Sequence, residues 1–316
     1  MIQAQFVQRK AEEIINSIET ILVGKRDVVM LSLVALLSKG HVLLEDVPGV
    51  GKTKMMKALA ASIGADFKRI QFTPDLLPSD VLGASIYNQR ENEFEYRQGP
   101  IMAQFVLADE INRTSPKTQS ALLEAMEEGF ITVDGVTRPL PEPFFVMATQ
   151  NPVDFEGTYR LPEAQLDRFL LKIKMGYPTP EQEMNILKTS LTSRASVDLP
   201  SIITMDELKE LQKEVQFVHA SDLVKRYIVS IVNKTRNHPL IQLGVSPRGS
   251  IALLKAAQAF ALLQGRDYVI PDDVQLLVPS ILSHRITVNA QGSFERKDAA
   301  DVLQELLHET SVPVIG

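Results

Sequence analysis

The stretch from His41 to Thr53, HVLLEDVPGVGKT, constrains this chain more than any other part of the sequence. It begins with a short apolar run, Val42–Leu44, which is typical of a strand that is buried on both faces of a parallel sheet. A glycine-rich turn follows, and the residues after Thr53 have helical composition. Strand, glycine-rich turn and helix form the context in which a phosphate-binding loop occurs. The alternative is a plain tight turn between a strand and a helix.

The turn supplies the chemical groups that a phosphate-binding loop needs. Its glycines allow backbone N–H groups to point at an anion, and the start of the following helix adds a partial positive charge. We expect Lys52 to reach the β and γ phosphates of ATP, or the β phosphate of ADP, and the Thr53 hydroxyl to complete the coordination shell of Mg²⁺. The strict pattern GxxxxGKS/T has a glycine where this chain has Asp46. The predicted phosphate-binding residues are Pro48, Gly49, Val50, Gly51, Lys52, Thr53 and Lys54.

A second motif consists of two adjacent carboxylates, Asp109 and Glu110, at the end of the apolar strand predicted over 104–110. Ligands of α/β sheets bind at the carboxyl ends of the strands. We expect Asp109 to hold Mg²⁺, directly or through water, and Glu110 to polarise the attacking water as a general base. An Asp-Glu pair after a strand is common in loops, and it becomes informative here because a phosphate-binding loop precedes it.

An amide follows the next predicted strand. The apolar run 144–148 leads into Asn151, whose side chain could hydrogen-bond the γ phosphate or the attacking water. The alternative is that Asn-Pro simply forms a turn after the strand. The neighbouring motifs favour the functional interpretation.

Two arginines stand in positions that indicate a function. Arg168 follows a short helix predicted over 163–167 and precedes the strand predicted over 170–174. It either forms an ordinary surface ion pair with Asp167 or reaches the nucleotide of a neighbouring subunit, as trans-acting arginines do in phosphoryl transfer. Arg248 lies in the first turn of a predicted helix, where the helix dipole disfavours a cation. That misfit indicates a functional position, and a solvated arginine is the alternative.

Strands and helices alternate in the first part of the chain. Strands are predicted over 42–44, 67–72, 104–110, 144–148 and 170–174. Two β-hairpins, over 84–101 and 130–137, interrupt this order as insertions, and Asp134-Gly135 in the second suits a type I′ turn. Two helices, 4–20 and 26–38, precede the phosphate-binding loop.

A proline-rich linker near 176–181 separates this region from a part with no strand pattern. Helices are predicted there over 181–194, 205–217, 221–236, 247–264, 271–285 and 297–308. We therefore expect an α/β nucleotide-binding core with N-terminal helices in residues 1–178 and a smaller all-helical lid domain in residues 179–316.

The composition is ordinary for a soluble globular protein, with 45% hydrophobic and 23% charged residues among 316. The net charge of −6 argues against a protein that coats nucleic acid through bulk electrostatics. The absence of cysteine excludes disulfides and thiolate–metal sites and fits the reducing cytoplasm. The N-terminal pattern is not that of a signal peptide, and no apolar run reaches about 18 residues, so we expect a cytoplasmic protein without membrane insertion.

Seven segments of the chain together resemble the AAA+ ATPases, and more closely the MoxR family. They read LLEDVPGVGKT, FTPDLLPSDVLG, YRQGPI, LADEINR, ATQNP, LPEAQLDRF and GVSPRGS. In sequence order they are Leu43–Thr53, Phe72–Gly83, Tyr96–Ile101, Leu107–Arg113, Ala148–Pro152, Leu161–Phe169 and Gly244–Ser250. The resemblance covers essentially the whole chain.

Carried over position by position, the resemblance assigns Lys52 and Thr53 to the Walker A motif and Asp109 and Glu110 to the Walker B motif. It implies an ATPase that depends on Mg²⁺. Loops similar to those of MoxR proteins often carry an acid at the position of Asp46, so this departure does not imply a lost site.

The resemblance also assigns three residues that would act on the nucleotide. Asn151 corresponds to sensor 1, Arg168 to the arginine finger that enters the neighbouring subunit's site, and Arg248 to sensor 2, which would contact the nucleotide of its own subunit. Val23 and Gly24 fall where such proteins seat the adenine.

The implied fold is a five-stranded parallel sheet of order 5-1-4-3-2 with a helical lid. The two hairpins resemble the helix-2 insert and the pre-sensor-1 hairpin of the clade that also contains magnesium chelatase and MCM-type helicase motors. The implied assembly is a homo-oligomeric ring, a hexamer, that remodels or activates a protein client, often with a von Willebrand factor A domain protein.

Two other functions are consistent with the motifs. One is a nucleic-acid translocase or a motor subunit similar to that of magnesium chelatase, against which the acidic chain and the lack of an appended DNA-binding module argue. The other is a scaffold that binds ATP with little turnover, against which the complete set of Lys52, Asp109 and Glu110 argues.

Overall fold

The computed structural model describes residues 4–46, 49–151, 158–190 and 199–313 of the chain. Its centre is a five-stranded parallel sheet. From one edge to the other the strands are β2 (Phe67–Gln71), β5 (Phe105–Asp109), β8 (Phe145–Gln150), β1 (Val42–Glu45) and β9 (Leu171–Ile173). Counted along the chain these are core strands 2, 3, 4, 1 and 5, so the predicted order 5-1-4-3-2 is confirmed.

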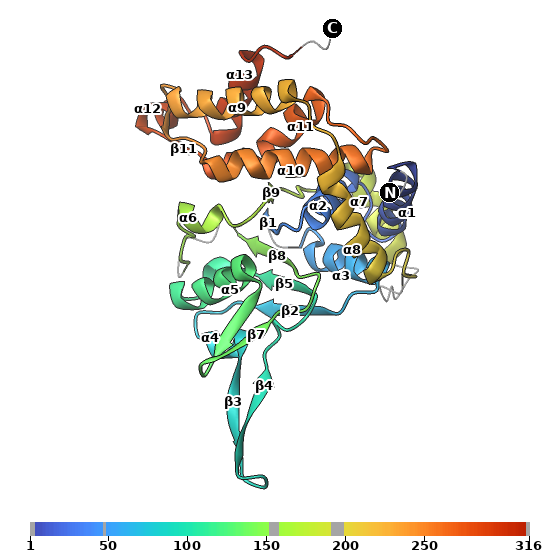
Figure 1. Cartoon of the computed structure of the whole chain (residues 1–316), viewed down its shortest axis with the longest axis vertical. Coiled ribbons are helices and arrows are strands. Elements are labelled where there is room, and N and C mark those ends of the chain that lie inside the picture. The colour runs from blue at the N-terminus through green and yellow to red at the C-terminus, as the bar shows by residue number, and fades with distance from the viewer. Residues whose placement is uncertain (1–3, 47–48, 152–157, 191–198, 314–316) are drawn as a thin grey trace.

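Helices cover both faces of the sheet, because successive side chains of a strand point to opposite sides. Val42 and Leu44 of β1 belong to one apolar cluster, and Leu43 belongs to the other. The first cluster includes helices α1 (Ala4–Glu19), α2 (Arg26–Leu37) and α3 (Lys52–Ile63). The second includes α4 (Pro78–Leu82) and α5 (Pro116–Glu128). The core is therefore a three-layer α/β/α unit (Figure 1). Its strands β5, β8 and β1 are buried on both faces, whereas the edge strand β2 is largely exposed.

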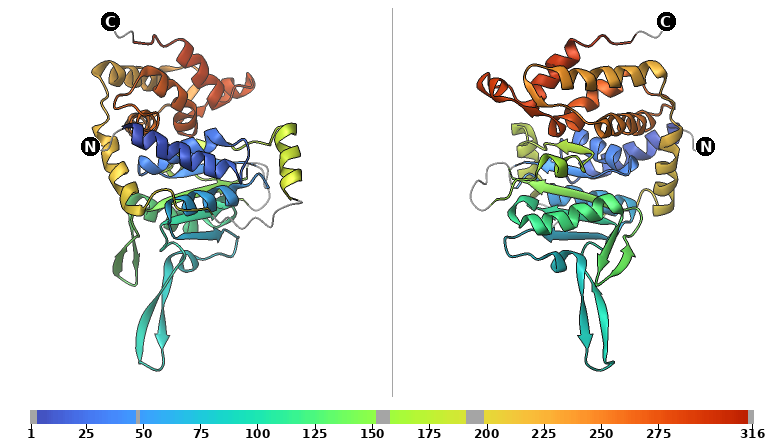
Figure 2. Two further views of the ribbon diagram at one scale, coloured as in Figure 1. Left: turned by 90° about the vertical axis from the view of Figure 1, so that its right-hand side faces the viewer. Right: turned by 60° about the vertical axis from the view of Figure 1, so that its left-hand side comes forward.

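Both inserted hairpins are confirmed. The first consists of β3 (Gly83–Asn88) and β4 (Glu93–Gln98), and the second of β6 (Phe130–Val133) and β7 (Val136–Pro139). Asp134 and Gly135 have φ of 53° and 75°, the two positive values that a type I′ turn requires. The β3–β4 hairpin projects from the core at the end opposite the lid (Figures 1 and 2).

Among the residues that the structure describes beyond β9, the regular elements are helices apart from one short ladder. The helices are α7 (Pro180–Ser190), α8 (Met205–Glu214), α9 (Asp222–Asn237), α10 (Pro247–Leu263), α11 (Pro271–Leu282), α12 (Ala290–Phe294) and α13 (Ala299–His308). The expectation of an all-helical region is wrong at β10 (Ile241–Leu243) and β11 (Thr287–Val288), which form a two-stranded antiparallel ladder. Strands of three and two residues are too short to show an alternating pattern in the sequence.

The lid packs directly on the core. Helix α10 lies against α1 and α2, and α8 lies against α2. One apolar cluster runs from a face of the sheet through these helices into α10 and α11 (Figure 1). The short 3₁₀ helix η3 (Ser283–Arg285) contacts α6 (Glu163–Leu166), the short helix that precedes β9. The lid therefore touches the core close to Arg168. Among the described residues, no helix has the length and apolar character that crossing a membrane requires.

Candidate active site

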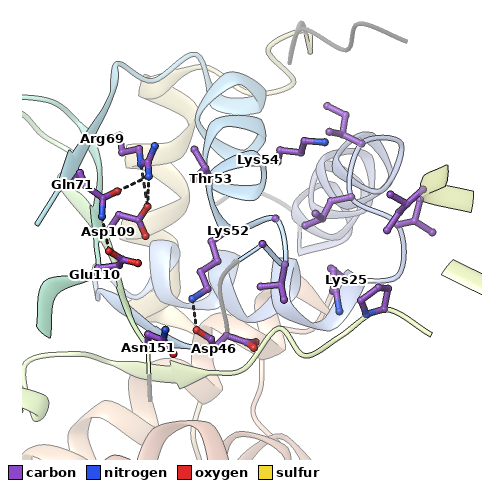
Figure 3. A pocket seen from close by; sticks show the side chains of 18 of the residues that line it. Lys25, Asp46, Lys52, Thr53, Lys54, Arg69, Gln71, Asp109, Glu110 and Asn151 are labelled. Atoms are coloured by element: carbon purple, nitrogen blue, oxygen red, sulfur yellow. Dashed lines mark hydrogen bonds and ion pairs between the residues drawn. The ribbon is translucent and has the colours of Figure 1, made fainter. Parts of the chain in front are cut away.

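A cavity of about 700 Å³ lies where the loop after β1 meets the carboxyl ends of β5 and β8 (Figure 3). We call it the nucleotide cavity. The predicted residues that line it are Val23, Gly49, Val50, Gly51, Lys52, Thr53, Lys54, Asp109, Glu110 and Asn151. Pro48 lies outside the described residues. The structure thus brings together groups from four separate segments of the chain, three of which follow neighbouring strands of the sheet.

The phosphate-binding loop has the backbone that its glycines allow. Gly49 and Gly51 have φ of 88° and 100°, in the left-handed region where a Cβ is disfavoured. Helix α3 begins at Lys52, so its first N–H groups face the cavity side of the loop. Burial lowers the pKa of the Lys52 ammonium, and the carboxylates of Asp46 and Asp109 oppose that shift. The ammonium donates to the Asp46 backbone oxygen at 2.6 Å.

Asp46, the departure from the strict glycine pattern, holds the linker to the lid. Its Oδ2 accepts a hydrogen bond from the Gly176 N–H at 2.6 Å. Lys25 fixes the same linker, because its ammonium donates to the carbonyls of Met175 at 2.6 Å and Gly176 at 2.9 Å. Sequence reasoning assigned Lys25 no role. Both side chains therefore tie the floor of the nucleotide cavity to the start of the lid.

A buried threonine contacts the Asp109 carboxylate and the Glu110 backbone. The Thr149 hydroxyl on β8 donates to Asp109 Oδ1 at 2.6 Å and accepts from the Glu110 N–H at 2.8 Å. Glu110 has φ of 59°, a left-handed conformation that costs energy for a residue with a side chain and occurs at functional sites. Sequence reasoning missed Thr149, although it lies two residues before the predicted Asn151.

Side chains from β2 and from the turn after β5 hold the carboxylates from the other side. Arg69 donates to Asp109 Oδ2 from Nη2 at 2.6 Å and from Nε at 3.1 Å. Gln71 Nε2 donates to Glu110 Oε2 at 2.9 Å, and Arg113 Nη1 donates to the same oxygen at 3.1 Å. Figure 3 shows Arg69, Gln71 and the two carboxylates as one connected network. Sequence reasoning missed all three partners.

The oxygen donors fit magnesium that arrives with a nucleotide. The Thr53 hydroxyl and the Asp109 carboxylate line the same cavity, and hard oxygen ligands are those that Mg²⁺ prefers. Within the described parts of the chain, no group of three His, Cys, Asp or Glu side chains could hold a metal alone. Phosphate oxygens would therefore have to supply much of the coordination shell, and Arg69 competes for Asp109.

The two predicted adenine-binding residues differ in whether they line the nucleotide cavity. Val23 lines the nucleotide cavity beside Ile21, whereas Gly24 does not line it. Gly24 has φ of 72°, and a Cβ at this position would overlap the Gln182 side chain of α7. The positive φ is what favours glycine here, because the Gln182 side chain is flexible and could move away from a Cβ. Ile186 of α7 also lines the cavity, so the beginning of the lid forms part of its wall.

Arg168 and Arg248 do not line the nucleotide cavity. Both reach one carboxylate, Glu127 at the end of α5. Arg168 Nε lies 2.9 Å from Glu127 Oε2, and Arg248 Nη2 lies 2.7 Å from Glu127 Oε1. The Glu127 carboxylate compensates the unfavourable position of Arg248 in the first turn of α10. The expected contact of Arg248 with a nucleotide of its own subunit is not part of this geometry.

The fold and the cavity define a class of protein. The sheet order, the phosphate-binding loop after strand β1, the paired carboxylates after β5 and the helical lid are together those of the AAA+ P-loop NTPases. Two family models match the chain in the corresponding places. The model described as "ATPase family associated with various cellular activities (AAA)" matches residues 41–171, and the AAA lid domain model matches residues 233–306.

Known proteins narrow the class to a family. The chain is 63% identical to the uncharacterized protein YeaC of Bacillus subtilis, over 95% of this chain and 94% of that protein. It is 43% identical to the chaperone MoxR1 of Mycobacterium tuberculosis, over 96% of this chain and 83% of that protein. The crystal structure of a candidate ATPase from Cytophaga hutchinsonii superimposes with a TM-score of 0.92 at 37% identity, covering 98% of this chain and 97% of that one. The chain belongs to the MoxR family of AAA+ ATPases.

Proposed function

We propose that this protein hydrolyses ATP to ADP and phosphate in a Mg²⁺-dependent reaction. The observation that carries the proposal is the nucleotide cavity, in which the Lys52 loop at the start of α3 faces Asp109 and Glu110. A cation beside the phosphates and a carboxylate beside the attacking water are the parts that phosphoryl transfer requires.

The reaction gives a role to each of the predicted catalytic and metal-binding residues that line the cavity. The backbone N–H groups of the loop and Lys52 bind the β and γ phosphates. Glu110 accepts the proton of the attacking water, and Asn151 orients that water or the γ phosphate. Thr53 and Asp109 would hold Mg²⁺, which neutralises developing charge on the phosphate oxygens when bound. The hydrogen bond from Gln71 and the ion pair with Arg113 must loosen before the Glu110 carboxylate can serve as a base.

We further propose that the ATPase works as a homo-oligomeric ring, a hexamer, in which Arg168 completes the neighbouring subunit's site. Two cations that line the cavity are already engaged, Lys25 by carbonyls and Arg69 by Asp109. The transition state spreads negative charge over the γ phosphoryl oxygens, and arginines supplied in trans stabilise it in related reactions. Arg168 lies outside its own cavity, on the loop that leads to the edge strand β9. That placement supports delivery to another subunit.

The biological role that we propose is chaperone-like remodelling of a protein client in the cytoplasm, with a von Willebrand factor A domain protein as partner. The relative from Mycobacterium tuberculosis is named a chaperone, which supports the first part. Purification of the tagged protein from its own cells, with and without Glu110→Gln to slow release, tests the second part. Recovery of no von Willebrand factor A domain protein in either sample would remove that partner.

Hydrolysis is tested by phosphate release from ATP with and without EDTA. We expect turnover that EDTA abolishes, and loss of ATP binding in Lys52→Ala measured by calorimetry. Unchanged ATP affinity in that variant would show that the loop does not bind phosphate. Addition of single-stranded and double-stranded DNA should leave the rate unchanged, and strong stimulation would instead favour a nucleic-acid motor.

The shared site is tested by mixing two inactive variants. Subunits with Arg168→Ala keep their own phosphate loop, and subunits with Lys52→Ala keep their own finger. Mixed rings then contain interfaces with one intact loop facing one intact finger, and part of the activity should return. Background activity in rings that demonstrably mix would mean that Arg168 does not act in trans.

A further inference from the structure

A buried arginine of the lid, Arg285, holds the segment that carries Arg168. Its side chain is only 4% exposed, although it belongs to the C-terminal part of the chain and the segment belongs to the core. A buried guanidinium is costly unless its donors are satisfied, so the groups it contacts indicate why it lies there.

The five N–H donors of this guanidinium all find acceptors. Nε donates to Asp167 Oδ1 at 2.7 Å. Nη2 donates to the carbonyls of Phe169 at 2.7 Å and Asp167 at 3.2 Å, and Nη1 donates to the carbonyl of Leu170 at 3.1 Å. Nη1 also donates to the Ile281 carbonyl in the lid itself and lies 2.8 Å from Nε2 of the neighbouring His284. Four of the six contacts therefore go to residues 167–170.

Arg168 sits between the residues that Arg285 holds. Asp167 on one side is bound through its side chain and its carbonyl, and Phe169 on the other side is bound through its carbonyl. The Leu170 N–H bonds the His41 carbonyl at the start of β1, which fixes the far end of the segment to the sheet. The backbone on both sides of Arg168 is thus clamped between lid and sheet.

We propose that Arg285 is a positioning residue for Arg168, through which the lid of one subunit sets the reach of its finger into the site of the next. The proposal rests on the proposed role of Arg168 in trans. A planar fork with five donors can hold a carboxylate and three carbonyls at once, whereas the three donors of a lysine radiate from one point. Arg285→Lys therefore keeps the charge but loses the planar set of five N–H donors.

Arg285→Lys should lower kcat by up to about 10²-fold with the KM for ATP unchanged, because misplacing a catalytic group by about 1 Å has an effect of that size. Asp167→Asn weakens a single contact of the fork and should lower kcat less. The matched control is Arg266→Lys, since Arg266 forms a two-pronged ion pair with Asp273 inside the lid at 2.8 Å and 2.5 Å. That control should lower the melting temperature and leave kcat unchanged.

Mixing experiments separate a finger defect from a defect in the subunit's own site. Arg285→Lys subunits mixed with Lys52→Ala subunits should regain activity, because the latter supply well-placed fingers. Arg285→Lys subunits mixed with Arg168→Ala subunits should stay inactive, because every finger in those rings is defective. The opposite pattern would place the effect of Arg285 in its own nucleotide site and overturn the proposal.

The reference mixture of Arg168→Ala with Lys52→Ala distinguishes the positioning role of Arg285 from the trans role of Arg168. If this mixture regains activity and the Arg285→Lys mixture with Lys52→Ala does not, the positioning role is wrong while the shared site stands. If the reference mixture stays inactive, the proposed function of Arg168 is wrong, and Arg285 with it. Should Arg285→Lys fail to fold, Asp167→Asn is carried through the same mixtures, and unchanged kcat in that variant overturns the proposal.

Discussion

In the nucleotide cavity the partners of the acidic side chains, apart from the buried Thr149, are exposed, whereas around Arg168 the key partner is buried. Arg69, which pairs with Asp109, has a side chain that is 47% exposed. Arg285, which pairs with Asp167, is 4% exposed and satisfied on all sides. The first arrangement can rearrange at low cost when a charged ligand enters, because water can replace each lost contact. The second cannot.

This difference agrees with the roles that we propose for the two regions. In the proposed reaction Asp109 and Glu110 would exchange protein partners for Mg²⁺, water and phosphate in every cycle, so weak and replaceable contacts suit them. In the proposed ring the 167–170 segment would present one arginine at a constant place, so a dense and buried set of contacts suits it. Glu127 lies between these extremes, because it is partly exposed and shared by Arg168 and Arg248.

The largest effect that this comparison predicts is that of Arg168→Ala. Hydrolysis should fall by about 10³-fold or more, while ATP affinity by calorimetry stays close to that of the wild type, because the finger acts on the transition state. The control is Arg9→Ala, which removes a helix-surface ion pair with Glu13 and should keep both values. A parallel loss of ATP affinity would mean that Arg168 binds the nucleotide of its own subunit, and the contrast between the two regions would not hold.

Glu110→Gln should have the next largest effect. The amide keeps the size of the side chain but cannot accept the proton of water, and loss of a general base lowers a rate by about 10²–10⁴-fold. ATP binding should be retained, as measured by calorimetry on the same preparation. Turnover at the wild-type rate would exclude Glu110 as the base and leave its contacts with Gln71 and Arg113 purely structural.

Glu127→Gln should have a moderate effect. A partly exposed ion pair contributes roughly 1 kcal/mol, so looser placement of Arg168 should lower kcat by about fivefold with an unchanged KM. The double variant with Arg168→Ala should be no slower than Arg168→Ala alone. Additive losses in steady-state kinetics would show that Glu127 acts independently of the arginine.

Arg69→Ala should have the smallest effect, and it should improve the use of Mg²⁺ instead of lowering the rate. Removing the cation from Asp109 should lower the Mg²⁺ concentration for half-maximal hydrolysis by about twofold, as expected for an exposed ion pair. A magnesium titration of ATPase activity measures it. A higher midpoint would contradict the competition and would mean that Arg69 helps to bind the nucleotide.

Much of the fold and of the nucleotide cavity could be predicted from the sequence because the signals are local. The strand, glycine turn and helix around Lys52 are contiguous, and Asp109-Glu110 directly ends its own strand. The Asp134-Gly135 turn specifies its hairpin through two positive φ angles. The ladder of β10 and β11 escaped prediction because its pairing joins segments that are far apart in the chain and very short.

The hydrogen-bond and ion-pair partners of the predicted residues could not be predicted from local sequence signals. Arg69 meets Asp109 only because β2 lies beside β5, a neighbourhood that sheet order decides. Thr149 reaches Asp109 and Glu110 from β8 on the other side of β5 for the same reason. A sequence indicates that a residue is on a strand and on which alternate face, but it does not indicate which side chain of another strand lies opposite.

What the sequence by itself determined is the chemistry of the nucleotide cavity: a cation on a glycine loop, a hydroxyl, two carboxylates and an amide at strand ends. Only the tertiary structure decided which groups restrain them, and where the two arginines go. Arg168 and Arg248 lie far apart in the sequence and meet at Glu127, and Arg285 is buried against residues 167–170 by packing of the lid. The physical reason is that hydrogen bonds and ion pairs depend on distance in space, which long-range packing alone establishes.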